Sequence, residues 1–453
     1  MLMRKVYKHL LAGLFLCSAT LTNAATMSFT TAKAAGETFA IALNPGLTVT
    51  VTWADGTTEQ FVSDGSLQTL TLASQKFTIE TDAEVTSLYV AGNELTFMDL
   101  TKTSNTLKKL YCGNNALTTL NLTSFKNLNE VDAQGNKLTT LKVYGPENVN
   151  GTDNQLSSFA ATQFARLKQL YLADNLLKGM STSQMTSLEY LFVQRNAIKT
   201  LRLNKCAALK VASLSDNAVT TFDISGISSL KELWLGGNTL DELDITAADS
   251  LEWLVTPGAN LKTILWNNAC KKTLTYADLS NNRLFFNSFP TVRNNEVLTT
   301  AILAPQNPYP LVEEGYVYAG TENNWSSAKL QPMSTNGWGS ASAPLLTITD
   351  SEGNTLTEGD DSTACDYRNY LRRITFWPSA VGKTVAIAAT SNYYADVTLT
   401  TTPFLVTTAT GIEGVKAGES DRKADVYYNL NGQRVDKPSH GVYITNGKKV
   451  IIR

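Results

Sequence analysis

Apolar residues recur at a fixed spacing along residues 86–289, and each copy of the pattern carries an asparagine at the same place. The copies include LKKLYCGNNALTTLNLTSFKN from Leu107, LEYLFVQRNAIKTLRLNKCAA from Leu188 and LKELWLGGNTLDELDITAADS from Leu230. Their shared pattern is L-x-x-L-x-(L/V/C)-x-x-N-x-(L/I/V)-x-x-L-x-L. The asparagines are Asn93, Asn115, Asn136, Asn154, Asn175, Asn196, Asn217, Asn238 and Asn282. We expect four of them, Asn175, Asn196, Asn217 and Asn238, to be buried in a stack of such units instead of contacting a ligand.

One copy shows how the unit should fold. Leu110, Tyr111 and Cys112 alternate, which predicts a short strand with Leu110 and Cys112 pointing inward. Asn115 then turns the chain, because its amide can pair with turn backbone that would otherwise be buried without a partner. The residues that follow are too few for a long helix, so extended or 3-10 segments are expected on the convex side.

A single unit cannot bury its own apolar row, so the units must stack into a continuous core. The period of about 21 residues lies inside the range of roughly 20–29 residues that is typical of leucine-rich repeats. The sequence therefore predicts a mainly β fold, a leucine-rich-repeat solenoid of about ten repeats over residues 85–302.

The repeats depart from their pattern in two places. The interval between Asn136 and Asn154 is shortened and contains Pro146, which cannot donate a backbone hydrogen bond, so a local kink is expected there. Further along, Ala259 occupies the asparagine position and Asn260 follows it. The far end of the stack is therefore expected to be less regular.

The segments on either side of the repeats are typical of β structure. Residues 25–84 are rich in threonine and hold alternating runs such as VTVTW between Gly, Asp and Asn turns, which predicts an N-terminal β-rich cap over the first turn. Residues 303–410 hold runs such as RRITFWP and TVAIAAT and predict an immunoglobulin-like β-sandwich. Residues 411–453 are expected to form a polar linker and a small three-strand meander with Asn-Gly turns.

The first 24 residues have the composition of a secretory signal peptide. Three cations are followed by an apolar run and then by small residues ending at Ala24. The apolar run is too short to span a bilayer, and nothing later in the chain is long and apolar enough to do so. The sequence therefore predicts a secreted or cell-surface protein that is not an integral membrane protein.

Charge and histidine content narrow the chemistry. The formal net charge is −2, and losing the cations of the signal peptide would make the rest more acidic, which argues against nucleic acid as a partner. The two histidines are His9, in the signal peptide, and His440, in the tail, so the body offers no Ser-His or Cys-His pair and no histidine metal cluster. A carboxylate pair for glycoside cleavage stays open. We expect no enzymatic activity, no cofactor and no metal site, with calcium binding undecided.

Four cysteines remain after the signal peptide, and none is expected to form a disulfide. Cys112 is at an inward strand position and should be a small core residue. Cys206 and Cys270 are three repeats apart, and strands stack at about 4.8 Å each, so they are too far apart to be bridged. The fourth is Cys365, and the chain has no CxxC motif.

Two stretches resemble known families. NNALTTLNLTSFKNLNEVDAQGNKL, within the repeats, resembles bacterial surface leucine-rich-repeat proteins of internalin-like build. That resemblance implies a cap, a solenoid and an immunoglobulin-like domain, and it implies surface binding or adhesion. The end of the chain resembles the C-terminal sorting domain of type IX secretion substrates through NGQRV at 431–435, GVYI at 441–444 and KKVIIR at 448–453. This segment is shorter than that domain. The resemblance implies secretion or sorting machinery as a partner.

The repeat register also predicts a binding surface. In each strand the residue between the two inward positions faces the concave side, and so does the residue two places before it. Aromatic residues at these positions on neighbouring turns should form an exposed stripe, and such patches are seldom left unused. The expected ligand-binding residues are Tyr171, Tyr190, Phe192, Trp234, Trp253 and Tyr276. The alternative is that the downstream β-domain folds over this end and buries Trp253 and Tyr276.

The sequence therefore predicts a non-enzymatic exported surface protein that binds a protein ligand, for adhesion or host-cell interaction, through the concave face of the repeats. A glycan-binding surface protein that serves polysaccharide capture is the alternative, because flat aromatic rings also stack on sugars.

Overall fold

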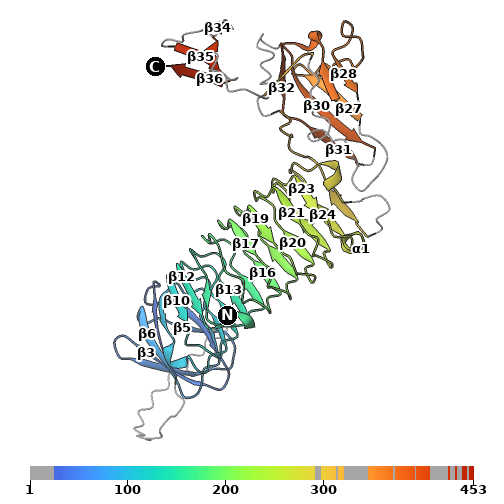
Figure 1. The fold of residues 1–453 in the computed structure, drawn as a ribbon. Coiled ribbons are helices and arrows are strands. Elements are labelled where there is room, and N and C mark those ends of the chain that lie inside the picture. The colour runs from blue at the N-terminus through green and yellow to red at the C-terminus, as the bar shows by residue number, and fades with distance from the viewer. Residues whose placement is uncertain are drawn as a thin grey trace, which may run out of the picture. The chain divides into compact units, whose positions relative to one another are not determined.

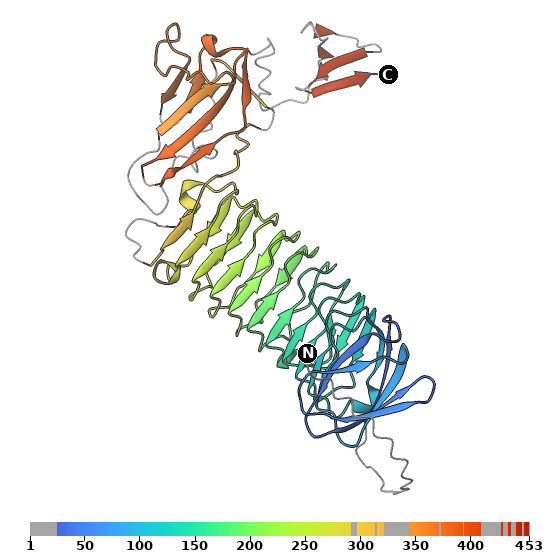
Figure 2. The same ribbon diagram turned by 180° about the vertical axis from the view of Figure 1, so that it is seen from behind.

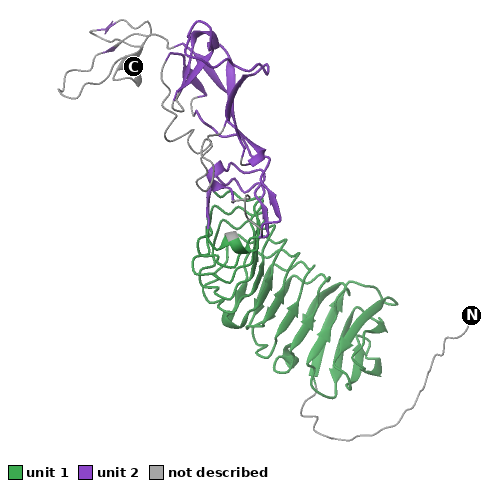
Figure 3. Cartoon of the chain, turned by 90° about the vertical axis from the view of Figure 1, so that its right-hand side faces the viewer, with its two compact units in different colours: residues 1–240, 244–256, 267–274 green, residues 241–243, 257–266, 275–453 purple. Residues whose placement is uncertain are grey.

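The structure is a computed structural model that describes residues 25–290, 297–312, 315–320, 345–370, 373–392, 394–408, 427–428, 434–435, 441–445 and 448–452. The expected signal peptide and the polar linker lie outside these ranges. The chain divides into two compact units (Figure 3). Unit 1 comprises residues 1–240, 244–256 and 267–274, and unit 2 comprises 241–243, 257–266 and 275–453. Within the described residues, no helix is long and apolar enough to cross a membrane.

Unit 1 begins with an antiparallel β cap, drawn in blue in Figure 1. The strand order of its sheet is β4-β3-β6-β1-β8. These strands are β1 (Ala25–Thr31), β3 (Thr48–Trp53), β4 (Thr58–Val62), β6 (Lys76–Thr81) and β8 (Leu95–Asp99). The core of the cap is aromatic, since the ring centroid of Phe77 lies 4.9 Å from that of Phe39 and 5.5 Å from that of Phe29.

A strand of the cap joins it to the first repeat. β2 (Thr38–Leu43) pairs antiparallel with β5 (Gln68–Thr71) and with β7 (Ser87–Tyr89), the first repeat strand. Asn93 fixes this joint, because its side-chain carbonyl accepts from the Ala40 amide at 2.8 Å and its Nδ2 donates to the Ala40 carbonyl at 2.7 Å. The cap thereby covers an end of the stack that would otherwise expose apolar side chains.

A parallel sheet runs through the repeats, with one short strand for each turn, and its strands lie side by side in Figures 1 and 2. In unit 1, β7 is followed by β9 (Lys109–Tyr111), β11 (Glu130–Asp132), β13 (Asn148–Asn150), β15 (Gln169–Tyr171), β16 (Tyr190–Phe192), β18 (Val211–Ser213), β20 (Glu232–Trp234) and β22 (Trp253–Val255). In unit 2, β24 (Tyr276–Asp278) pairs with β25 (Thr300–Ile302). The prediction of a mainly β leucine-rich-repeat solenoid of about ten turns is confirmed.

Short extended segments and 3-10 turns form the convex side, as the sequence predicts. The convex strands are β10 (Thr119–Leu122), β12 (Thr140–Val143), β14 (Ala160–Ala161), β17 (Thr200–Arg202), β19 (Thr221–Asp223), β21 (Glu242–Asp244) and β23 (Thr263–Leu265). The short helices are η1 (Thr101–Thr103), η2 (Phe164–Arg166), α1 (Cys270–Thr273) and η3 (Phe286–Ser288).

The asparagines of the repeats form a ladder between successive turns. The side-chain carbonyl of Asn175 accepts from the Leu156 amide of the preceding turn at 2.9 Å, and its Nδ2 donates to the Gly151 carbonyl at 2.9 Å. Asn196 and Asn217 make equivalent bonds but are half-buried, so the expected burial holds for Asn175 and Asn238 and not for these two. The stack hides the backbone groups of the turns from water, and the ladder supplies those groups with hydrogen-bond partners.

The residue before each asparagine of the ladder adopts a left-handed backbone conformation. Examples are Asn114 at φ 54°, Asp174 at φ 56° and Gly237 at φ 68°. Gly, Asn and Asp tolerate this conformation best, so the turn selects them. Arg195, at φ 54°, is the exception, and its guanidinium pairs with the carboxylate of Asp174 on the preceding turn at 2.6 Å between Nη2 and Oδ2.

The stack accommodates its two irregular places, the interval around Pro146 and the far end, in different ways. Around Pro146 the parallel pairing continues, since β13 pairs in register with both β11 and β15. The chain folds closely on the convex side instead, because a Cβ on Gly145 would lie 2.5 Å from the Gln163 carbonyl oxygen. At the far end Gln306 takes over the ladder, where its Oε1 accepts from the Leu284 amide at 3.0 Å and its Nε2 donates to the Leu279 carbonyl at 2.8 Å.

Unit 2 continues into a C-terminal β-domain. A sheet of order β26-β32-β30-β27 carries β31 beside β30, and β28 and β29 form a separate hairpin. The strands are β26 (Tyr316–Tyr318), β27 (Leu345–Asp350), β28 (Tyr367–Tyr370), β29 (Arg373–Phe376), β30 (Thr384–Ser391), β31 (Tyr394–Thr400) and β32 (Phe404–Thr407), with a 3-10 turn η5 (Pro378–Ala380). Phe376 of the hairpin packs against Phe404 of the sheet, with ring centroids 5.9 Å apart.

The β-domain closes the last turn of the repeats within unit 2. The Tyr394 ring lies 5.3 Å from Phe289 and stacks on Phe286 at 6.0 Å, and its hydroxyl donates to the Pro290 carbonyl at 3.2 Å. Phe286 and Phe289 are fully buried. The second end of the apolar core is therefore covered, as a solenoid requires.

The tail contains more strands than the sequence predicts. β33 (Tyr427–Tyr428), β34 (Arg434–Val435), β35 (Gly441–Thr445) and β36 (Lys448–Ile452) form one antiparallel sheet of order β34-β33-β35-β36. The two predicted Asn-Gly turns lie outside the described residues.

Candidate functional site

The concave face of the repeats presents two columns of side chains, and the strand register confirms the columns predicted from the sequence. Each first strand residue pairs with the first residue of the next strand, and each third with the third. In unit 1 the first column is Ser87, Lys109, Glu130, Asn148, Gln169, Tyr190, Val211, Glu232 and Trp253. The third column is Tyr89, Tyr111, Asp132, Asn150, Tyr171, Phe192, Ser213, Trp234 and Val255.

Three of the expected site residues gather on neighbouring strands of unit 1. Tyr171 and Phe192 stack with ring centroids 5.1 Å apart and planes 8° from parallel. Tyr190 precedes Phe192 by two residues on β16 and so lies on the same face. All three residues are half-buried, and the stacked rings of Tyr171 and Phe192 cover one side of each other.

The two tryptophans form a second group. Trp234 and Trp253 stack with centroids 6.4 Å apart and planes 25° from parallel. The Trp234 indole N–H points to Glu232 Oε2 at 3.4 Å. Trp253 keeps 39% of its surface exposed. Val211 and Ser213 of β18 lie between the two groups, as the predicted column order has them.

Tyr276 belongs to unit 2. It is half-buried at the start of β24, where it pairs with Thr300 of β25. The other five expected site residues all belong to unit 1.

Sequence reasoning missed a polar group on the N-terminal half of the same face. Asn150 Nδ2 donates to Asp132 Oδ1 at 3.2 Å and to Gln134 Oε1 at 3.1 Å. The backbone N–H of Gln134 also donates to Asp132 Oδ1, at 3.2 Å. Tyr111 precedes Asp132 in the third column and Tyr171 follows Asn150. The column order in the sequence already contained this signal, which a search for aromatic residues alone passes over.

The electrostatics of this polar group follow from its burial. Half-burial raises the pKa of the Asp132 carboxyl above its ordinary value, and the nearby Glu130 carboxylate adds to the shift. Burial also raises the pKa of Tyr111, with Glu130 again contributing. Lys109 offsets part of this negative charge through a 3.5 Å ion pair with Glu130.

We expect Asp132→Asn to raise the free energy of unfolding at pH 7 and to leave it unchanged near pH 3. Because the folded-state pKa is raised, the stability contributed by this carboxyl is present below the unfolded pKa of about 3.9 and is lost as the pH rises through the folded pKa. Asparagine removes the charge and keeps an oxygen that can accept from Asn150. Urea unfolding between pH 3 and pH 8 measures the difference, with exposed Glu80→Gln as control. A loss of stability at pH 7 would contradict the raised pKa of the Asp132 carboxyl.

Ion pairs border the concave face. The Nζ atoms of Lys168, Lys210 and Lys231 lie 3.0, 2.6 and 2.8 Å from carboxylate oxygens of Glu147, Glu189 and Glu252, each on an adjacent turn. These side chains are exposed or half-buried, and pairs at the surface contribute on the order of 0–1 kcal/mol each. They support the register of the stack.

The thiols of the repeats are core groups. Cys112 is fully buried, and burial raises its pKa to about 12. Cys206 and Cys270 are buried too, and all four described cysteines are free. In the part of the chain that the structure describes, no three His, Cys, Asp or Glu side chains are grouped to hold a metal ion.

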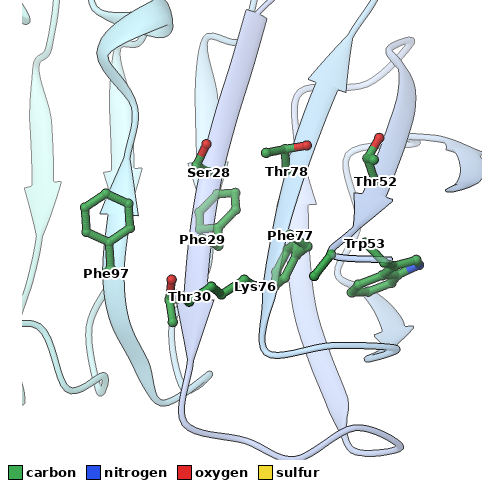
Figure 4. A pocket seen from close by; sticks show the side chains of 10 residues that line it. Ser28, Phe29, Thr30, Thr52, Trp53, Lys76, Phe77, Thr78 and Phe97 are labelled. Atoms are coloured by element: carbon green, nitrogen blue, oxygen red, sulfur yellow. The ribbon is translucent and has the colours of Figure 1, made fainter. Parts of the chain in front are cut away.

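An open groove of about 600 Å³ lies on the outer face of the cap sheet. Figure 4 shows its lining, in which Ser28, Thr30, Thr52 and Thr78 alternate with the aromatic rings beneath them and Phe97 stands at one side. Outward hydroxyl residues and inward rings are typical of an antiparallel sheet with one solvated face.

The fold and the face together define a leucine-rich-repeat protein with an aromatic and polar concave sheet. No family model and no curated protein matches the chain. Among solved structures, it is similar to the functional domain of InlJ from Listeria monocytogenes, at 18% identity and a TM-score of 0.37 over 70% of this chain and 81% of that one.

Two further structures are similar to the chain. The internalin InlF of Listeria monocytogenes is 19% identical with a TM-score of 0.32, over 50% of this chain and 91% of that one. A leucine-rich-repeat protein of Leptospira interrogans is 22% identical with a TM-score of 0.36, over 46% of this chain and 63% of that one. The fold assignment itself rests on the repeats of this chain.

Proposed function

We propose that the protein is an exported, non-enzymatic binding protein that holds an extracellular protein ligand through the concave face of its repeats. The observation that carries the proposal is the stacked pair Trp234–Trp253, together with the stacked pair Tyr171–Phe192 on the same sheet. Large rigid rings supply contact area at little entropic cost, and Trp and Tyr are enriched among the residues that dominate protein interfaces.

The surroundings of the tryptophan pair favour a partner with cationic side chains. Glu232 lies beside the Trp234 indole, and Glu252 follows at the rim in its ion pair with Lys231. An arginine or lysine of the partner could stack on an exposed indole face and pair with Glu232, which adds about 0.5–2 kcal/mol for each cation–π contact. Adhesion or host-cell interaction follows from such binding only where the protein is displayed outside the cell.

A defined binding panel tests the ligand class. The purified chain is immobilised and probed by surface plasmon resonance with purified matrix proteins and receptor ectodomains, and in parallel with an array of polysaccharides. A saturable protein ligand that is lost with the tryptophan pair supports the proposal. Binding confined to polysaccharides would contradict a protein ligand at this site.

Export is the second part of the proposal, and deletion of residues 425–453 tests it. The support is the apolar leader with its preceding cations and the resemblance of the tail to sorting domains. We expect the full chain to reach the cell surface and the truncated chain to accumulate before that step, as measured by cell fractionation and surface proteolysis. The control is the exposed substitution Glu80→Gln in the full chain. Equal surface amounts of full and truncated protein would remove the sorting role of the tail.

A further inference from the structure

A groove opens at the N-terminal end of the concave face, where loops of the cap meet the first two repeat strands. It has a volume of about 570 Å³ and is lined by Tyr89, Tyr111 and Lys109 from the strands and by Asn44 and Leu67 from the cap. Tyr89 is 37% exposed and Leu67 58% exposed. The two tyrosine rings lie 6.2 Å apart. This volume is in the range of about 300–1,000 Å³ that small-molecule sites occupy.

The third column continues from this groove as an in-register row across six strands. The row reads Tyr89, Tyr111, Asp132, Asn150, Tyr171 and Phe192. One carboxylate and one amide therefore lie between two aromatic pairs, both of which are in ring contact. With strands about 4.8 Å apart, the row spans roughly 24 Å, which suits a ligand of several linked rings.

The polar centre of the row is held in place and still has capacity to bind. Asn150 bridges Asp132 and Gln134, so the three side chains fix one another. Asp132 Oδ2 and Gln134 Nε2 make no hydrogen bond to any residue that the structure describes, which leaves an acceptor and a donor on two side chains that share Asn150 as a partner. Groups fixed before binding lose little entropy on binding.

We propose that this region, from the groove at Tyr89 to Tyr171, is a binding site for a neutral oligosaccharide. A pyranose ring has an apolar face that can stack on the tyrosines and hydroxyl groups at its edge that can pair with Asp132 and Gln134. The site uses the same concave face as the proposed function, but it shares no tryptophan with the protein-binding region and does not require that partner.

Charge and polarity argue for this ligand over two others. Glu130 and Asp132 repel a polyanionic glycan, and Lys109 is already paired with Glu130. An apolar protein side chain placed over the row would bury the Asp132 and Gln134 groups without partners, which is unfavourable. A ligand rich in hydroxyl groups satisfies them.

Isothermal titration of the full-length chain tests the proposal. The probes are neutral hexasaccharides of gluco, manno, xylo and galacto configuration, with a heparin hexasaccharide as the polyanionic comparison. We expect at least one neutral series to bind and heparin not to bind. Asp132→Ala should weaken the Kd about tenfold or more, because a hydrogen bond to a charged group is lost. Tyr111→Ala should weaken it similarly, whereas Tyr111→Phe, which keeps the ring, should stay within about twofold of the parent.

Two matched variants show whether the sugar affinity depends on this row in particular. Asp278→Ala removes a carboxylate at the equivalent position of a later strand, where Ser280 makes the same local bond and Ile302 is the strand neighbour. Trp234→Ala with Trp253→Ala removes the proposed protein-binding pair. Neither should change the sugar affinity, so loss of one activity leaves the other measurable.

The proposal is overturned if no neutral hexasaccharide binds, if heparin binds in preference, or if Asp132→Ala and Tyr111→Ala bind sugar as well as the parent does. Melting temperatures are measured for each variant. If Asp132→Ala does not fold, Tyr89→Ala at the exposed end of the row replaces it, with the same expected loss and the same contrary outcome.

Discussion

We expect Asn175→Ala to lower the free energy of unfolding by about 3 kcal/mol, because it leaves several buried backbone groups without partners. Asn175 Oδ1 accepts from the Leu156 amide, and its Nδ2 donates to carbonyls of Gly151, Leu172 and Ala173. The side chain is 6% exposed, so water cannot readily replace it. Each turn of the stack depends on the next, so a break in the ladder weakens both neighbours.

Thermal and urea unfolding of the full chain measure this effect, and two further variants serve as comparisons. Asn196→Ala removes the same bonds from a half-buried position and should cost about 1–3 kcal/mol, less than Asn175→Ala. Asn127→Ala removes an exposed bond to the Asn105 carbonyl of the preceding turn and should cost under about 0.5 kcal/mol. A melting temperature of Asn175→Ala equal to that of the parent would refute the ladder as a source of stability.

The double substitution Trp234→Ala and Trp253→Ala should abolish measurable binding of the protein ligand while the chain stays folded. Interface residues of this kind cost at least about 2 kcal/mol each when truncated, which is roughly thirtyfold in Kd. The rings stack on each other at the concave surface and do not fill the inner core, which the middle leucines of the strands occupy. Surface plasmon resonance against the ligand identified in the panel gives the affinity, and circular dichroism gives the fold.

The matched control is Phe97→Ala, which removes a ring that is 52% exposed on the outer face of the cap. It should leave the affinity unchanged, because its surface is not on the concave sheet. Loss of structure in the tryptophan variant would show that the pair packs the fold. Unchanged affinity in a folded variant would place the protein ligand elsewhere.

The periodic features of this protein were predictable from the sequence. Leu110 and Cys112 point inward, Asn115 joins the ladder, and the two concave columns have the predicted register. A repeated unit stacks in one register only, because a slip by one residue would bury charges such as Lys109 and Glu130 and expose leucines. The order of side chains along each column is therefore fixed by the chain itself.

The contacts that side chains make with one another were decided by the tertiary structure. The sequence does not show that Tyr171 stacks on Phe192 and Trp234 on Trp253, or that Asn150 bridges Asp132 and Gln134, because ring contacts and side-chain rotamers are not periodic. It also does not show that Gln306 ends the ladder, that Tyr394 closes the last turn, or that Leu67 of the cap forms a groove with Tyr89. These contacts join residues far apart in the chain, so they depend on how the finished elements pack, and local pattern carries no record of them.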